Sequence, residues 1–360
     1  MAATTPEPIV NALTAGKLPK AAPAILLLTS IAVFVIGSSL MQAAGLTEDL
    51  NWIGAIILGV IAFVIINFVM ALLVEGIRQA TDRLVTSLVV SAFVIALIPL
   101  VWLLVTVLQF GAATMFDGTF LNNSMRNVVG EGGGALHAIV GTLIITGLAA
   151  VISVPVGLMT AIYLVEYGTG RLARGITFLV DVMTGIPSIV AGLATYAFFV
   201  ILFGEGVKMG FAGSVALSIL MIPVVVRSSE EILKLVPNEL REASYALGVP
   251  KWLTIVRIVL PTSVAGITTG VMLAISRVIG ETAPLLIVAG LTTSMNYNPF
   301  ADRMTSLPVF VYNQYASPGT DAQFYIERAW AGALTLILIV ALLNIVARVV
   351  SYFFSPKLSR

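Results

Sequence analysis

Long apolar runs separate the few charged residues of this chain, and this segregation limits the possible folds more than any other feature. Residues 85–110 and 137–165 contain no acidic residue, lysine or arginine. A helix of about 20 apolar residues crosses the hydrocarbon core of a bilayer. Only 10% of the 360 residues are charged, against about a quarter in soluble domains. The runs do not alternate apolar and polar residues as barrel strands do, so the sequence predicts an all-α polytopic membrane protein.

Eight apolar segments are long enough to span a membrane. They cover 23–44, 52–74, 85–110, 137–165, 176–203, 210–227, 262–292 and 329–354. Pro223 interrupts the sixth segment close to Arg227, which makes that boundary the weakest of the set. Pro187, after Gly185, is also expected to kink its helix. The first two segments carry no intramembrane charge, so we expect them to form an added hairpin.

The basic residues lie mainly on one side of these segments. Fourteen of the 19 lysines and arginines fall in the two tails and in the loops around 78, 171 and 227–257, whereas Arg126, Lys208, Arg303 and Arg328 fall on the other side. The positive-inside rule therefore predicts that both termini and the 227–257 loop are cytoplasmic.

Composition also excludes several classes of site. The chain has no cysteine and one histidine, so a thiolate metal site, a disulfide frame and a multi-histidine metal site are excluded. A net charge of +1 gives no reason to expect nucleic acid as a partner. No catalytic residue and no bound cofactor is expected.

The charged loop at 228–261 holds the most specific spacing in the chain. Glu242, Ala243 and Ser244 are followed by Gly248, and then by Leu260 and Pro261. Glycine suits the position after a helix end and proline the first turn of a new helix. The loop is therefore expected to hold two short amphipathic helices joined at Gly248 and Pro250, with Leu240, Ser244 and Leu247 on one face of the first helix.

This spacing resembles the EAA loop of ABC-importer permeases, which seats in a cleft of the ATPase subunit. Ser244 replaces the commonest third alanine but is also small. The resemblance assigns ATPase coupling to Glu242, Ala243, Ser244, Gly248 and the Leu260–Pro261 pair.

Three further strings resemble the A-type permease subunit of phosphate-specific ABC importers. They are PVGLMTAIYLVEY at 155–167, TGIPSIVAG at 184–192 and SRVIGETAPLL at 276–286. The resemblance implies a type I permease fold, with a six-helix core at 79–360, a two-helix hairpin at 23–78 and a cytoplasmic tail at 1–22. It implies a bacterial cell membrane protein that imports inorganic phosphate.

The same resemblance implies partners. They are a sister C-type permease, two ATPase subunits that use ATP, and an extracytoplasmic phosphate-binding protein, with membrane lipid around the complex. The chain itself would bind no ATP and would not be an enzyme.

Two arginines are candidates for the transport pathway. Arg277 and Glu281 are expected one turn apart on one face of the seventh span. A charge at the bilayer centre costs about 2.5–3.5 kcal/mol on insertion scales, so each should face protein or water. The resemblance assigns transport to Arg277 and Arg227, and Thr282 adds a hydroxyl beside them. A purely structural ion pair between Arg277 and Glu281 remains the alternative.

Other functions stay open at this stage. A permease for sulfate or molybdate would share the coupling loop but not be expected to share GETAPLL. An ion channel would not need that loop, and an intramembrane hydrolase would need a nucleophile motif that the chain lacks.

Overall fold

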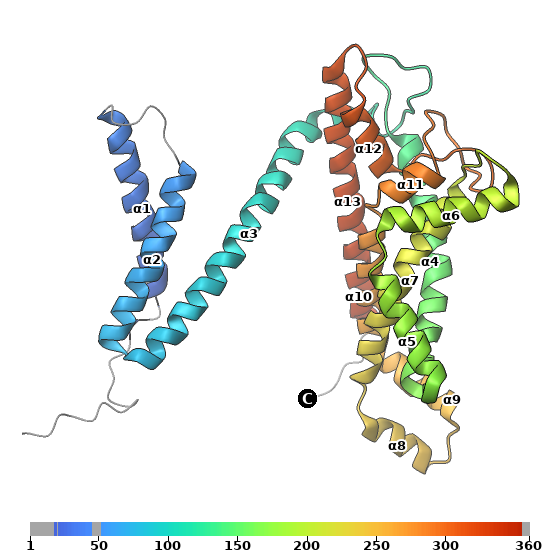
Figure 1. Cartoon of the computed structure of the whole chain (residues 1–360), viewed down its shortest axis with the longest axis horizontal. Coiled ribbons are helices and arrows are strands. Elements are labelled where there is room, and N and C mark those ends of the chain that lie inside the picture. The colour runs from blue at the N-terminus through green and yellow to red at the C-terminus, as the bar shows by residue number, and fades with distance from the viewer. Residues whose placement is uncertain (1–17, 20, 45–51, 355–360) are drawn as a thin grey trace, which may run out of the picture. The chain divides into compact units, whose positions relative to one another are not determined.

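The computed structural model describes residues 18–19, 21–44 and 52–354. The chain divides into two compact units, Met1–Leu104 and Val105–Arg360. The described residues form helices, turns and loops (Figure 1), so the expected all-α fold is confirmed. Most of the predicted tail at 1–22 lies outside the described residues.

The first unit contains a helical hairpin and the start of a long helix. Its elements are α1 (Ala22–Ala43), α2 (Trp52–Val74) and the first part of α3 (Ile77–Met115). A stripe of α2 residues at every fourth position is buried: Ala55, Gly59, Phe63, Asn67 and Ala71. A Cβ on Gly59 would lie 2.8 Å from Ile31 Cα, so the small residue permits close approach of α1 and α2. Asn67 donates to Ser87 Oγ at 3.0 Å, which ties α2 to α3.

The second unit contains the remaining helices. After the end of α3 it holds α4 (Leu136–Ile162), the π-helical turn η1 (Tyr163–Tyr167), α5 (Gly170–Thr184), α6 (Ser188–Phe203), α7 (Gly210–Lys234), α8 (Asn238–Ala246), α9 (Lys251–Thr254), η2 (Ile255–Val259), α10 (Leu260–Val278), α11 (Ala283–Val288), α12 (Leu307–Ala316) and α13 (Ala322–Phe354).

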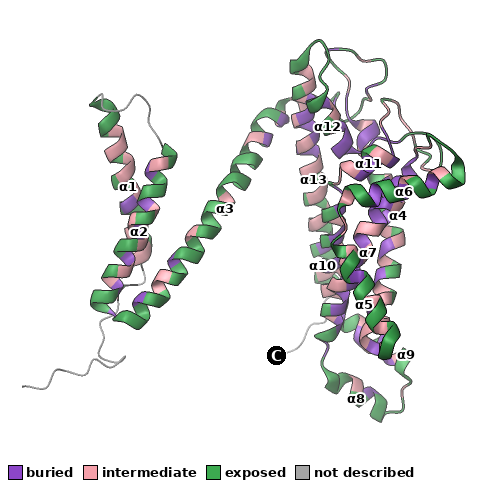
Figure 2. Cartoon of the chain, viewed as in Figure 1, coloured by how far each residue is buried: buried purple, intermediate pink, exposed green. Residues whose placement is uncertain are grey.

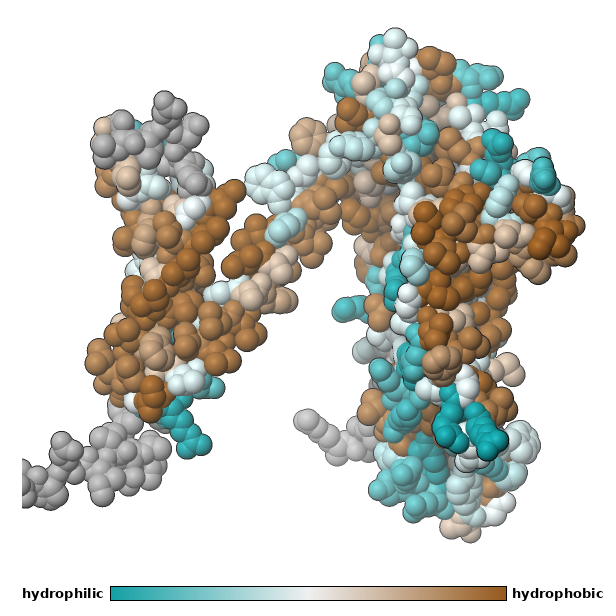
Figure 3. Space-filling view, viewed as in Figure 1, coloured by the Kyte–Doolittle hydropathy of each residue, from teal (hydrophilic) through white to brown (hydrophobic). Residues whose placement is uncertain are grey.

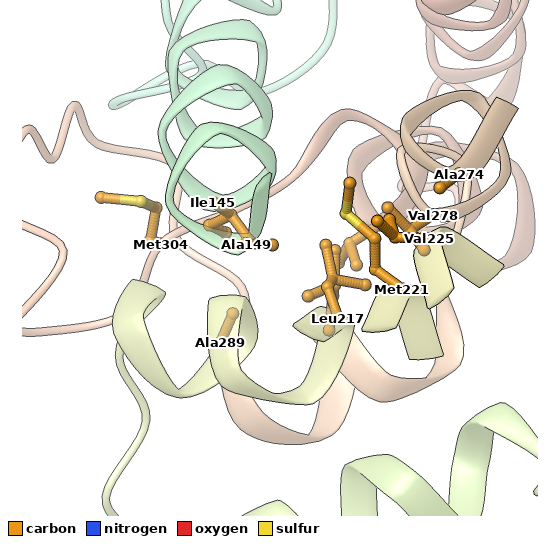
Figure 4. Close-up of a cluster of buried hydrophobic side chains, with 11 residues drawn as sticks. Ile145, Ala149, Leu217, Met221, Val225, Ala274, Val278, Ala289 and Met304 are labelled. Atoms are coloured by element: carbon orange, nitrogen blue, oxygen red, sulfur yellow. The ribbon is translucent and has the colours of Figure 1, made fainter. Parts of the chain in front are cut away.

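Helix α7 is the centre of this unit. It packs against α4 and α10, and its Leu217, Met221 and Val225 are completely buried. Figure 4 shows these side chains between Ile145 and Ala149 of α4 and Ala274 and Val278 of α10. The predicted sixth span is thus longer than expected, because the helix continues through buried Pro223 to Lys234.

The eight predicted spans correspond to seven long apolar helices and one bent pair. In the fifth, α5 and α6 meet at an angle of 107°. The break falls at Gly185–Pro187, where proline fixes its own φ and disfavours a helical residue before it. The expected kink is confirmed.

The predicted seventh span, 262–292, is wrong as a single helix. Helix α10 ends at Val278, Ile279–Thr282 are not helical, and the six-residue α11 follows. At its other end the helix begins much earlier, because α9, η2 and α10 run on without interruption from Lys251.

Candidate functional site

The turn after α8 has the geometry that Gly248 predicted. Gly248 has φ +75°, and its N–H donates to Tyr245 O at 2.9 Å, while the Val249 N–H donates to Ser244 O at 3.2 Å. This pair of bonds is the Schellman motif, which satisfies the last carbonyls of a helix. The chain then turns through Pro250 into α9. The local sequence therefore fixes the end of α8.

The second helix of the loop differs from the expectation. It is not short, because α9 continues through the π-helical turn η2 into α10. Leu260 and Pro261 open α10 directly after that turn. Proline has no N–H to offer to the preceding turn, and a π-helical turn in such a place changes the local hydrogen-bond spacing.

Ser244 joins the two arms of this loop. It is 3% exposed, and its hydroxyl bonds to that of Thr254 at 2.8 Å. The three residues expected on one face have different surroundings, because Leu240 is 41% and Leu247 84% exposed. A small hydroxyl residue at 244 thus has a structural reason within the loop itself.

Arg241 attaches α8 to the rest of the unit. Its guanidinium donates to Glu166 Oε1 of η1 at 2.9 and 3.0 Å, and to the carbonyls of Leu233 and Val236. Both charged side chains are nearly buried. Lys251 also donates to the Glu166 carbonyl and lies over the Tyr167 ring. Sequence reasoning missed Arg241 and Glu166 as partners, because 75 residues separate them and nothing in their spacing signals the contact.

The outer face of α8 carries Glu242 and Ala243, both exposed. This helix lies at one end of the second unit, with hydrophilic residues gathered over it (Figures 1 and 3). Figure 2 shows that the helix is mostly exposed. Arg241 thus holds a short amphipathic helix at its base and leaves these two residues exposed.

Arg277 occupies the last turn of α10, and its side chain is exposed. It continues an exposed stripe with Thr269 and Leu273. Its neighbour Ser276 accepts from Asn344 Nδ2 at 3.2 Å, and Asn344 lies about 15 Å before the end of α13 at about 1.5 Å per residue. Arg277 therefore lies beside the interior of the long apolar helix α13 and not beside its end.

The expected helical pair of Arg277 and Glu281 does not form. Glu281 follows the end of α10, so the two residues do not share a helical face. Among the described residues, no ion pair joins them within 4.0 Å. Glu281 and Thr282 are half-buried in the break between α10 and α11. Irregular backbone at membrane depth is tolerated where protein buries it or where it lines an aqueous cavity.

Two of the family strings meet at this break. A Cβ on Gly192 of α6 would lie 2.7 Å from Pro284 Cα at the start of α11. TGIPSIVAG and GETAPLL are nearly a hundred residues apart in sequence, yet they form one close helix contact. Glycine at 192 thus sets the position of the residues that follow Arg277.

Arg227 is held by two carboxylates. It pairs with Asp181 of α5 and with Glu230 at 2.8 Å, and Glu230 also binds Lys234 at 2.7 Å. The contact with Asp181 joins α5 to α7. The guanidinium is partly exposed but already neutralised, unlike that of Arg277.

The chain is similar in sequence to known transport proteins. Residues 153–360 match the family described as "Binding-protein-dependent transport system inner membrane component". The phosphate transport system permease protein PstA 1 of Mycobacterium tuberculosis H37Rv is 48% identical over 277 residues, covering 76% of this chain and 89% of that protein. PstA of Pasteurella multocida is 40% identical over 283 residues, covering 78% and 96%.

A solved structure shares the fold. The bacterial alginate ABC transporter, in complex with an alginate pentasaccharide-bound periplasmic protein, contains a chain that aligns with a TM-score of 0.52 at 15% identity. The alignment covers 75% of this chain and 96% of that one.

Proposed function

The chain belongs to the binding-protein-dependent transport permeases and, among them, to the PstA phosphate transport permeases, and on that premise we propose that it forms half of an import pathway for inorganic phosphate. It is a multi-pass transport subunit and not an enzyme, and its family works with an ATPase and a binding protein. We assign it a sister C-type permease, two ATPase subunits that hydrolyse the ATP, and an extracytoplasmic phosphate-binding protein.

The position of Arg277 carries the proposal. An arginine exposed at membrane depth would cost about 2.5–3.5 kcal/mol against lipid. The exposed stripe of α10 is therefore covered by the sister permease or faces water. Arginine remains charged and binds phosphate oxygens through a planar fork. With no ion pair to Glu281 among the described residues, its guanidinium is available to a passing anion.

The pathway test separates transport from helix packing. Arg277→Leu combined with Glu281→Leu should assemble with the partners and import no phosphate. Arg277→Lys should lower uptake about 10- to 100-fold, since a hydrogen bond to a charged group contributes about 1.5–3 kcal/mol. Arg348→Lys makes the same change at an exposed residue of α13 and is the matched control. Normal phosphate uptake in the double variant would show that Arg277 is structural.

Coupling is assigned to α8 and its turn. Glu242 and Ala243 would contact the ATPase from the exposed face, while Ser244, Gly248, Leu260 and Pro261 shape the loop. Arg227 joins the pathway only in a state that releases it from Asp181 and Glu230. Glu281 and Thr282 line the break beside Arg277 in this assignment.

Orientation follows from the charge distribution, with both termini and α8 in the cytoplasm of a bacterial cell. The chain has no native cysteine, so single cysteines report without background. Cysteines at Asn122 and Asn298, both exposed, should react with an impermeant maleimide in intact cells. A cysteine at exposed Asn238 should react only after the membrane is opened. Labelling of position 238 from outside would reverse the orientation.

A further inference from the structure

Two basic residues meet at the end of the second unit that is opposite α8. Lys208 precedes the N-terminus of α7, and Arg303 precedes α12. They line a cavity of about 290 Å³ together with Gly206, Val207, Met209 and Asp302. Neither belongs to the coupling loop or to the break at Arg277.

Backbone hydrogen bonds bring these two residues to one place. The residue after Lys208, Met209, donates its N–H to Val288 O at 3.1 Å. The residue after Arg303, Met304, donates its N–H to Ala289 O at 3.0 Å. Val288 and Ala289 are consecutive at the end of α11, so two distant segments are fixed side by side.

The side chains of Lys208 and Arg303 both pack beside Gly290. A Cβ on Gly290 would lie 2.9 Å from Lys208 Cδ and 3.2 Å from Arg303 Cγ, and Gly290 has φ +79°. A residue with a side chain there would be strained by its backbone and would displace both stems. Glycine therefore allows the stems of the two cationic side chains to lie side by side.

The charges at this cavity are unbalanced. Among the described residues, no carboxylate lies within 4.0 Å of the Lys208 ammonium or the Arg303 guanidinium. Asp302 also lines the cavity and reduces the local charge, but two cations remain against one anion. Like charges placed together repel, and an anion between them removes that repulsion. Lysine and arginine donors both suit phosphate oxygens.

The cavity also lies close to Thr282, one of the predicted pathway residues. Six-residue α11 separates Thr282 from the Val288–Ala289 carbonyls, a distance of about 9 Å at about 1.5 Å per residue. Only four basic residues lie on this side of the predicted spans, and Arg328 is buried among loop carbonyls. Two of the remaining three converge here.

We propose that Lys208 and Arg303 form an outer site that holds a phosphate ion at the end of α11, before it reaches Arg277. This assignment rests on the proposed function, which sets the direction of transport and places the cavity on the extracytoplasmic side. Asp302 keeps the affinity low enough for release, as a conduction site requires.

Protection of Arg303 from chemical modification tests this site directly. The purified complex, without its binding protein, is treated with phenylglyoxal, and the modified arginines are quantified by mass spectrometry. Inorganic phosphate at ten times its dissociation constant should slow modification of Arg303 about tenfold, because about a tenth of the sites stay empty. Exposed Arg126, on the same predicted side, should react equally with and without phosphate.

Lys208→Gln supplies the second arm. It should abolish the protection of Arg303 by phosphate while leaving the reactivity of Arg126 unchanged, because half of the site is lost. Equal modification of Arg303 with and without phosphate in the folded complex would overturn the proposal. Protection of Arg303 that requires the docked binding protein but not phosphate would also overturn the proposal. In that case an acidic side chain of the binding protein would be the ligand.

This readout is independent of ATP hydrolysis and uptake. A complex that imports no phosphate can still show protection, and an active importer can fail to show it. Failure of the outer site and failure of the transport assignment are therefore distinguishable.

Discussion

The two units use similar apolar helices for different purposes. In the most apolar stretch of α7, 61% of residues are buried, against 22% in α2 and 6% in α1. The first unit buries one stripe of mostly small residues, while the second buries side chains around α7 and places charges at both ends. Hydropathy does not separate the units, and burial distinguishes α7 rather than every helix of its unit, since α13 is only 17% buried. We propose that the first unit anchors in lipid and that the second carries the transport machinery.

Three structural features occur in both units and provide matched tests of this comparison. They are a nearly buried ion pair, a glycine under a neighbouring backbone, and a glycine with positive φ in open space. If the comparison holds, each substitution in the second unit lowers uptake, and its counterpart in the first does not.

The largest effect is expected from the ion pairs. Arg241→Gln leaves Glu166 nearly buried without its partner, and breaking a buried pair costs about 3–5 kcal/mol. We expect loss of ATPase recovery with the membrane complex and loss of phosphate uptake. Arg83→Gln breaks the corresponding pair with Glu75, whose side chain is 6% exposed, and should lower the stability of the first unit while leaving phosphate uptake unchanged. Equal losses in both variants would remove the distinction between the units.

The next effect concerns close helix contacts. Gly192→Ala places a Cβ 2.7 Å from Pro284 Cα, and Gly59→Ala places one 2.8 Å from Ile31 Cα. Overpacking of this kind costs about 1–3 kcal/mol. Gly192→Ala should shift α11 and lower uptake, measured as initial rates at saturating phosphate, while complex assembly persists. Gly59→Ala should lower only the thermal stability of the hairpin, so a matching loss of uptake would contradict the comparison.

The smallest effect comes from backbone strain. Gly248 and Gly76 have φ +75° and +90°, and a Cβ on either would meet nothing within 4 Å. Valine in a left-handed conformation costs about 1–2 kcal/mol at each site. Gly248→Val should uncouple ATP hydrolysis from uptake, because it disturbs the turn behind Glu242. Gly76→Val should be transport-competent. Glu242→Ala removes the proposed ATPase contact without straining the backbone, and it should show the same coupling defect. Normal phosphate uptake in both Gly248→Val and Glu242→Ala would reject the docking assignment.

Local sequence was sufficient for the spans and the loop turn. Long apolar runs located the membrane segments, although 262–292 is not one helix, and Pro187 marked the bend between α5 and α6. Gly248 marked the end of α8, because a glycine with positive φ is a local requirement of the Schellman closure. The family strings indicated which residues matter but not that Gly192 and Pro284 touch.

Helix continuity was harder to predict. Apolar composition across 262–292 favoured one helix, yet the chain stops being helical at 279–282, where Glu281 leaves the face of Arg277. The spacing of apolar residues indicates which face a helix would bury. It does not show where contacts with neighbouring segments end that helix. The same limitation made α9 and α10 look like separate elements, since Lys251 and Arg257 interrupt the apolar pattern but not the helix.

The sequence by itself thus determined the membrane class, the approximate membrane segments and the turn after α8, because each depends on residues within one helix length. Only the tertiary structure decided that Arg241 binds Glu166, that Arg227 is already paired, and that Lys208 and Arg303 cross one glycine. These contacts join segments separated by 46 to 95 positions. Their geometry depends on how α4, α7 and α11 pack, and packing is a property of surfaces that distant parts of the chain create together.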